Sequence, residues 1–178
     1  SRVICEETAK DAMSSALNGA GLTMEEIEYI VGTGYGRLNI PFAKKNITEI
    51  SCHGMGAFWT DPRIKTVIDI GGQDCKVIKI DHDGKVREFV MNEKCAAGTG
   101  RFLEDTAVAL GLSVEELGPL SLKAGSKAPV SAQCSVFAET EVVSLLANRR
   151  PLEEIVAGIN DAVASRLAGL VLRVGLEE

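Results

Sequence analysis

The sequence has no excess of basic residues, no long apolar run and no CxxC motif, and each absence excludes a class of protein. Its 178 residues carry a formal net charge of −6, which argues against nucleic acid as a partner because phosphate binding requires a basic surface. No uninterrupted apolar stretch approaches the roughly 20 residues that span a bilayer, so we expect no membrane partner. Fixed-period repeats and low-complexity tracts are also absent. The composition, 46% hydrophobic and 25% charged, is ordinary for a soluble globular protein.

Neither end of the sequence resembles a natural terminus. The chain starts Ser1-Arg2-Val3 without an initiator methionine, and it enters a helical pattern without a signal peptide. It ends at Glu178, directly after a long predicted helix. We therefore expect a fragment that is incomplete at both ends.

The five cysteines are an odd number, which favours the reducing cytoplasm over a secreted disulfide framework. Cys5, Cys52 and Cys75 lie in predicted apolar helices or strands, where a thiol is usually a small buried side chain. Cys95 and Cys134 instead lie in polar loops, each directly before an amphipathic helix. Because a helix N-terminus favours the thiolate, we predict a functional role for these two.

The pattern of apolar residues changes near residue 65 and predicts an α/β fold. The part before this point is predicted to contain helices over 2–18, 23–26 and 47–58 and a strand over 29–34. The part after it begins with an antiparallel meander of three strands, over 66–70, 75–81 and 86–91. Four helices are predicted to follow, over 99–110, from 113, over 137–146 and from 151 to 174.

A glycine-rich turn, Asp69-Ile70-Gly71-Gly72-Gln73-Asp74, joins the first two strands of the meander. Glycines allow backbone N–H groups to approach phosphate oxygens, and a carboxylate at the end of a strand suits a hydrated Mg²⁺ ion. Asp74 and Lys76 would add metal and phosphate contacts. Taken alone, the segment is equally compatible with an ordinary Gly-Gly hairpin.

The two segments around Cys95 and Cys134 are rich in small and polar residues. Gly98, Thr99 and Gly100 lead into a predicted helix, whose N-terminus favours a bound anion, either a phosphate or a negatively charged cluster. Two thiolates do not complete a four-iron cluster, which takes four. The other cysteines could contribute, the two could form a disulfide, or two chains could each supply two ligands. The last arrangement, on a twofold axis, is the most economical.

In combination these segments resemble the ATP-dependent activators of 2-hydroxyacyl-CoA dehydratases and the related ATPase subunits of benzoyl-CoA reductase. The resemblance extends over nearly the whole chain, and the stretches that match are Ile47–His53, Val67–Lys76, Asn92–Phe102, Cys134–Leu146 and Ile155–Gly175. The resemblance implies a two-lobed actin-like ATPase fold with ribonuclease-H-like lobes. Residues 1–65 would be the C-terminal part of the first lobe and residues 66–178 the N-terminal part of the second.

The resemblance also implies a role for each motif. Asp69 and Gln73 would act in catalysis, and the residues that bind ATP or ADP with Mg²⁺ would be Gly71, Gly72, Asp74, Lys76, Gly98, Thr99 and Gly100. Cys95 and Cys134 would be the metal ligands through which a homodimer shares one [4Fe–4S] cluster. ATP hydrolysis would change the angle between lobes, and a low-potential electron, supplied by ferredoxin or flavodoxin, would pass to the acyl-CoA dehydratase or reductase in anaerobic metabolism.

The sequence departs from the family pattern in three places. Cys75 stands where serine is expected, and we expect it to be structural. The first phosphate hairpin and the Gly-Gly adenosine motif are both absent, so the chain alone encodes an incomplete nucleotide pocket. Two alternatives remain at this point: a small-molecule kinase of the same fold, or a non-catalytic ATPase-fold module that acts through partner contacts.

Overall fold

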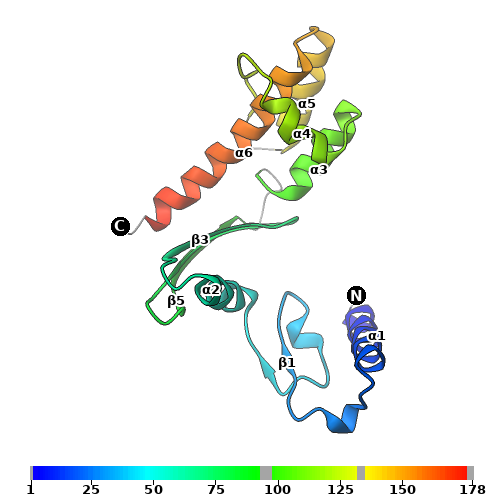
Figure 1. Ribbon diagram of the computed structural model, residues 1–178. Coiled ribbons are helices and arrows are strands. Elements are labelled where there is room, and N and C mark those ends of the chain that lie inside the picture. The colour runs from blue at the N-terminus through cyan, green and yellow to red at the C-terminus, as the bar shows by residue number, and fades with distance from the viewer. Residues whose placement is uncertain (1, 93–97, 132–134, 176–178) are drawn as a thin grey trace.

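The computed structural model describes residues 2–92, 98–131 and 135–175 (Figure 1). Its N-terminal part contains α1 (Arg2–Ala20), η1 (Met24–Glu26), β1 (Val31–Gly32), η2 (Arg37–Asn39), β2 (Lys45–Asn46) and α2 (Glu49–Thr60). The remainder contains β3 (Thr66–Ile70), β4 (Cys75–Ile80), β5 (Val86–Asn92), α3 (Gly100–Leu110), α4 (Val114–Ser121), α5 (Ser135–Ala147) and α6 (Leu152–Val174). This mixture of helices and strands confirms the predicted α/β class.

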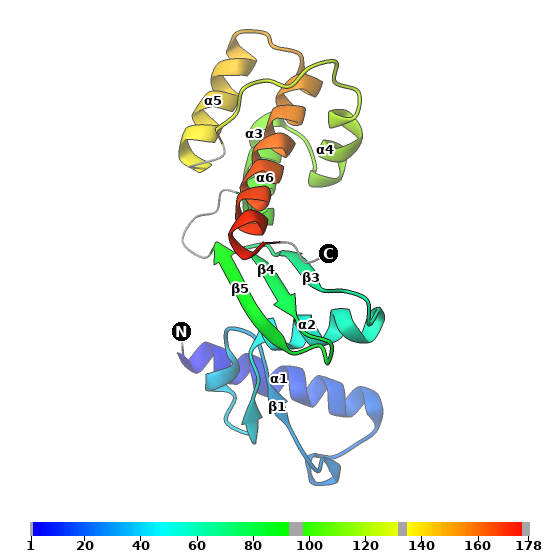
Figure 2. The ribbon, with the colours of Figure 1, turned by 90° about the vertical axis from the view of Figure 1, so that its left-hand side faces the viewer.

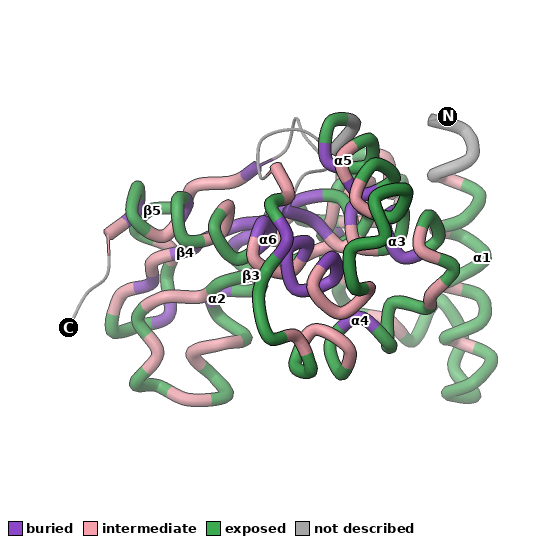
Figure 3. The backbone as a smooth tube through the Cα atoms, turned by 90° about the horizontal axis from the view of Figure 1, so that it is seen from above, coloured by how far each residue is buried: buried purple, intermediate pink, exposed green. Residues whose placement is uncertain are grey.

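The N-terminal part is held together by short elements rather than by a large core. Strands β1 and β2 pair in parallel over two residues each, so β1 is shorter than the strand predicted over 29–34. Gly34, with φ +80°, turns the chain away directly afterwards. Helix α2 starts after Thr48, whose Oγ1 accepts a hydrogen bond from the Ser51 backbone N–H at 3.1 Å. Helix α1 lies at one side, and Figure 3 shows no buried segment in its described length.

Strands β3, β4 and β5 form the predicted antiparallel meander, with β4 in the centre. Cys75 and Val77 pack against α6, whereas Ile78 and Ile80 pack in a cluster with Ile50 of α2. The alternation of residues over 75–81 predicts a half-buried strand, but this is wrong: every residue of β4 except Lys79 is buried, because helices cover both faces of the strand. Figure 2 shows the sheet between the N-terminal part and the remaining helices.

The C-terminal helices α3, α4 and α5 pack around the first half of α6. Their shared core contains Phe102, Ala138, Val142, Ile155, Ile159 and Val163. The second half of α6 leaves this group and packs on β4 through Leu170 and Val174. This confirms the apolar stripe that the sequence spacing predicts for α6, which consists of Ile155, Ile159, Val163, Leu167, Leu170 and Val174. The sequence likewise predicts an apolar face for α5, made of Phe137, Val142, Val143, Leu145 and Leu146. This is partly wrong, since Phe137 and Val143 are 66% and 54% exposed.

Helix α6 also has the length and composition of a membrane-spanning helix, with a hydropathy of 1.5 over its most apolar stretch. The core helix of a water-soluble protein has the same properties. Here 44% of that stretch is buried inside the structure, and Asp161 and Arg166 interrupt the apolar residues. The burial agrees with a core role for this helix.

Two glycines of α6 differ sharply in their surroundings, which allows a matched test of this packing. A Cβ added to Gly158 would lie 2.2 Å from the carbonyl oxygen of Ala128, whereas a Cβ at Gly169 would have no atom within 4 Å. We expect Gly158→Ala to lower the free energy of unfolding by about 1–3 kcal/mol through overpacking. Gly169→Ala should raise it by up to about 1 kcal/mol because alanine favours the helix. Urea unfolding of the full-length protein measures both, and equal effects would contradict the packing described.

Candidate nucleotide-binding site

The glycine-rich segment forms the turn between β3 and β4. The Gly71 N–H donates to the Asp74 carbonyl oxygen at 2.8 Å and closes the turn. A Cβ on Gly71 would lie 3.0 Å from this oxygen, so the turn leaves no room for a side chain there. A Cβ on Gly72 would have no atom within 4 Å. The backbone at Gly72 is therefore approachable, as a phosphate ligand requires. Gln73 is exposed in the same turn.

The start of α3 packs directly against this turn, so the structure brings together two segments that the sequence analysis treated as one site. The N–H groups of Gly100 and Arg101 donate to the carbonyl oxygens of Gly71 and Gly72 at 2.9 and 2.8 Å. A Cβ on Gly100 would lie 3.2 Å from the Gly72 Cα, which explains the need for glycine. These two N–H groups therefore hold the turn. They are already paired and do not point to a ligand.

The two residues directly before Gly100, Gly98 and Thr99, pack tightly next to the turn. Thr99 is fully buried, and Gly98 has a φ of +84°, a conformation that favours glycine. A Cβ on Gly98 would also lie 2.9 Å from Cγ of Arg166. Gly98 and Thr99 thus belong to the packing beneath the site, and their predicted contact with a nucleotide stays a prediction.

A buried lysine lies between the two carboxylates of the turn. The Lys76 ammonium donates to Oδ1 of Asp74 and lies 3.6 Å from Oδ2 of Asp69. The Lys76 side chain is 4% exposed and that of Asp74 is 7% exposed. In strand register Lys76 is the partner of Asp69, so the antiparallel pairing itself places the two charges together. Lys76 therefore offsets one of the two negative charges in this arrangement.

Burial and ion pairing shift the pKa values of Asp74 and Lys76 in opposite directions. Burial acts to raise the pKa of the Asp74 carboxyl, but hydrogen bonds from Lys76 and Tyr35 outweigh it, so the pKa lies below its usual value. Burial likewise acts to lower the pKa of Lys76, and the Asp74 carboxylate more than compensates and raises it. Both groups are therefore charged at neutral pH.

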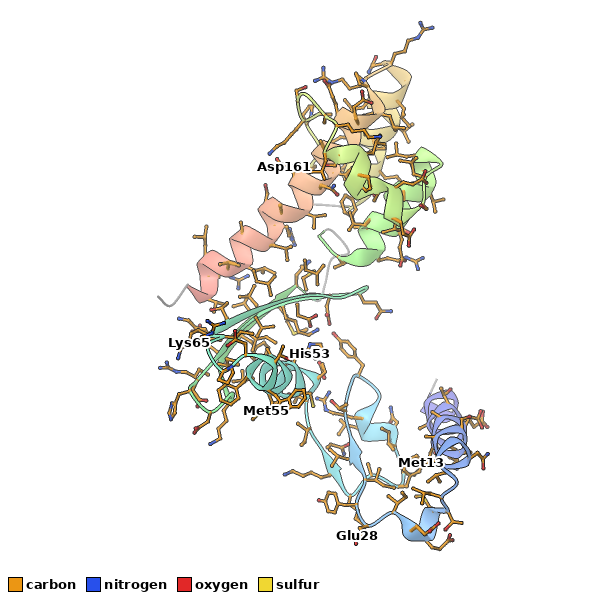
Figure 4. All side chains as sticks on the ribbon, viewed as in Figure 1. Met13, Glu28, His53, Met55, Lys65 and Asp161 are labelled. Atoms are coloured by element: carbon orange, nitrogen blue, oxygen red, sulfur yellow. The ribbon has the colours of Figure 1, made fainter. Side chains whose placement is uncertain are left out.

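Two residues that the sequence analysis did not select complete the site. The Tyr35 hydroxyl donates to Oδ2 of Asp74, and Nδ1 of His53 lies 2.8 Å from Oδ2 of Asp69. Figure 4 shows His53 on α2 beside strand β3. His53 is the last residue of the stretch Ile47–His53, whose match to the family was the one available signal. Tyr35 carried no signal beyond its position between two glycines.

The two cysteines whose side chains the structure describes, Cys75 and Cys52, differ in their surroundings. Cys75 is 1% exposed and its thiol donates to the Gly98 carbonyl oxygen at 2.8 Å. Burial raises the pKa of this thiol, which agrees with its predicted structural role. The prediction that Cys52 is buried is wrong, because α2 packs on the sheet through Ile50 and Gly54 and leaves Cys52 on its exposed side.

The predicted cluster ligands Cys95 and Cys134 lie outside the described residues, as does the side chain of Cys5. Helix α5 begins at Ser135, the residue after Cys134, as predicted. Within residues 2–92, 98–131 and 135–175, no group of three or more histidine, cysteine, aspartate or glutamate side chains could hold a metal ion. The ligand assignment therefore stays a prediction.

Comparison with known proteins places the chain in a family. The activator of lactoyl-CoA dehydratase from Anaerotignum propionicum is 48% identical over 94% of this chain and 64% of the relative. The solved activator of 2-hydroxyisocaproyl-CoA dehydratase from Clostridium difficile, with bound ADPNP, has a TM-score of 0.83 at 44% identity, over 95% of this chain and 63% of that structure. Component A of (R)-2-hydroxyglutaryl-CoA dehydratase from Acidaminococcus fermentans has a TM-score of 0.85 at 44% identity, over 95% of this chain and 65% of that structure.

These similarities confirm the actin-like ATPase fold that the resemblance implied. The chain spans 64% of the length of the activator of lactoyl-CoA dehydratase and similar shares of the two solved structures. The model of the BadF/BadG/BcrA/BcrD ATPase family matches residues 3–178. The chain therefore belongs to the BadF/BadG/BcrA/BcrD ATPase family.

Proposed function

We propose that the full-length protein uses ATP hydrolysis to drive low-potential electron transfer from a [4Fe–4S] cluster to an acyl-CoA dehydratase or reductase. The observation that carries this proposal is the turn between β3 and β4, with an approachable backbone at Gly72 and the carboxylates of Asp69 and Asp74, in a chain of an ATPase family. The names of the relatives, which are activators of acyl-CoA dehydratases, support the nature of the partner.

The residues present fit a nucleotide with Mg²⁺. The Asp69 carboxylate is 19% exposed at the end of β3, which suits a cation held through water. The Gly72 backbone would approach a phosphate, and the exposed Gln73 amide suits the orientation of an attacking water molecule. Asp74 and Lys76 would fix the charge of the turn rather than contact solvent. In the proposal ADP and ATP bind between the two lobes.

The proposal assigns Cys95 and Cys134 of two subunits as the four thiolates that hold one cluster in a homodimer. The cluster would supply a one-electron redox centre of low potential. The chain's own contribution is the start of α5 directly after Cys134, where backbone N–H groups stabilise an anion. Ferredoxin or flavodoxin would reduce the protein, and the reaction would take place in the cytoplasm.

The test uses the full-length protein purified without oxygen. We expect about four irons and four sulfides per dimer. We also expect that reduced protein delivers electrons to the partner enzyme only when ATP is hydrolysed. ATP turnover without bound iron would contradict the electron-transfer role and favour a kinase, whereas the absence of both iron and ATP turnover would favour a non-catalytic module.

Substitution of Gly72 tests the nucleotide part of the proposal separately. Gly72→Val is expected to weaken ADP binding at least about tenfold, because a branched side chain blocks backbone approach to phosphate. The fold should tolerate it, since no atom lies within 4 Å of the new Cβ. Gly125→Val is the matched control, a loop glycine with equally open surroundings that lies outside the turn. Calorimetric titration with ADP measures the difference, and unchanged affinity in Gly72→Val would rule out this phosphate site.

A further inference from the structure

The N-terminal part of the chain reaches the turn through two side chains to which the proposed function gives no role. The Tyr35 hydroxyl donates to Asp74, and His53 lies 2.8 Å from Asp69 through its Nδ1. Because a carboxylate only accepts, Nδ1 carries the proton. Each carboxylate therefore has one donor from the N-terminal part, and the two share Lys76 as their common cation.

These contacts leave one carboxylate oxygen for another partner. Both oxygens of Asp74 are used, by Lys76 and Tyr35, and Oδ2 of Asp69 is used by His53 and Lys76. Among the residues that the structure describes, Oδ1 of Asp69 takes part in no hydrogen bond or ion pair. His53 and Lys76 both hold Oδ2 of Asp69, which restricts the rotation of the carboxylate and so limits where Oδ1 lies.

Tyr35 and His53 are also connected to each other through the Arg37 side chain. One guanidinium nitrogen of Arg37 donates both to the Gly34 carbonyl oxygen and to Glu49, at 2.9 Å each. Glu49 is the first residue of α2, the helix that carries His53. Arg37 therefore holds the loop of Tyr35 against the helix of His53.

The exposure of the two side chains indicates that their polar groups matter more than their packing. Tyr35 is 65% exposed although its hydroxyl is hydrogen-bonded, and the His53 side chain is 47% exposed. Neither contributes to the hydrophobic clusters of the described residues. A purely structural role would bury more of each ring.

We propose that Tyr35 and His53 are positioning residues: His53 orients the Asp69 carboxylate for a nucleotide-bound divalent cation, Tyr35 holds Asp74 and through it the Lys76 that Asp69 shares, and both tie that site to the N-terminal part. The inference rests on the proposed nucleotide function. Residues that hydrogen-bond to metal-binding carboxylates orient them, and their loss typically weakens metal affinity or activity about 10- to 100-fold. The same two bonds join residues 1–65 to the turn, so occupancy of the site and the placement of the N-terminal part are coupled.

The experiment measures binding of Mn²⁺ in the presence of ADP, through the EPR signal of free Mn²⁺, to the full-length protein. Tyr35→Phe removes only a hydroxyl, and His53→Ala removes the donor to Asp69. We expect each to weaken Mn²⁺ binding about tenfold. His53→Asn should restore most of the affinity, because an amide N–H can replace the Nδ1–H. The midpoint temperature of thermal unfolding should stay close to the wild-type value in all variants.

The chain supplies a matched control for each substitution. Tyr29 is the other tyrosine and its ring lies beside Lys44, while His82 is the other histidine and is exposed in the turn between β4 and β5. Tyr29→Phe and His82→Ala should bind Mn²⁺ as the wild type does. Wild-type affinity in both Tyr35→Phe and His53→Ala overturns the positioning role alone. Failure of the wild type to bind Mn²⁺ with ADP overturns the nucleotide function, and this inference with it.

Discussion

Replacing either Cys95 or Cys134 by serine is expected to remove the iron from the full-length protein. If each subunit of a dimer supplies both cysteines, a single substitution removes two of the four thiolates at once. The remaining two cannot hold a four-iron cluster. ATP-dependent electron delivery should disappear together with the iron, whereas ADP binding should persist because the β3–β4 turn is unchanged.

The described cysteines provide the controls for this experiment. Cys52 is exposed and its Sγ lies 3.4 Å from Oγ1 of Thr33, so Cys52→Ser should leave the iron content unchanged. Cys75→Ser places a hydroxyl where the thiol donates to Gly98, with a packing cost of about 1 kcal/mol at most. Iron and sulfide per dimer, compared across Cys5, Cys52, Cys75, Cys95 and Cys134 substitutions, decide the assignment. A full cluster in Cys95→Ser and Cys134→Ser would show that the ligands lie elsewhere.

The sequence predicts the local elements of this fold well, because they depend on neighbouring residues. The Thr23 and Ser113 capping boxes form, with Glu26 and Glu116 accepting from the backbone N–H of the capping residue at 2.7 and 2.8 Å. The Asp83-Gly84 turn also forms between β4 and β5, where the Asp81 carboxylate accepts from the backbone N–H of Asp83 and Lys85. Each of these depends on residues within a few positions.

Contacts between distant residues were harder to predict. Burial of β4 on both faces depends on α2 and α6, which lie on opposite sides of it in sequence and in space. The bond from Tyr35 to Asp74 joins positions that are 39 residues apart. No periodicity or motif encodes such a pair, because it arises only when the N-terminal part lies against the turn. The glycines of the turn could be identified from the sequence, because close approach of the backbone to a phosphate requires glycine at those positions.

Lys76→Met is expected to destabilise the protein by about 3 kcal/mol at neutral pH, since removing one member of a buried ion pair leaves the other charge uncompensated. The Lys76 side chain is 4% exposed, and both Asp74 and Asp69 would lose their cation. Methionine fills a similar volume, so the effect reports charge rather than a cavity. Lys10→Met is the matched control, because Lys10 pairs with Glu6 on the surface of α1, and it should leave stability unchanged.

The pH dependence of the stability difference between the wild type and Lys76→Met shows whether Lys76 stabilises the fold through its charge or through its packing. In the wild type the pKa of Asp74 is lowered and that of Lys76 is raised, so the pair stabilises the fold above about pH 4 and below about pH 10. Without Lys76, burial acts on Asp74 with only the Tyr35 hydrogen bond to oppose it, so its pKa should rise above the wild-type value. The carboxyl of the variant then takes up a proton at a higher pH than that of the wild type, so the stability gap between the two proteins narrows as the pH falls towards the ordinary carboxyl range near about 4. Urea unfolding at several pH values measures this gap. A constant gap across that range would mean that Lys76 stabilises the turn through packing and not through its charge.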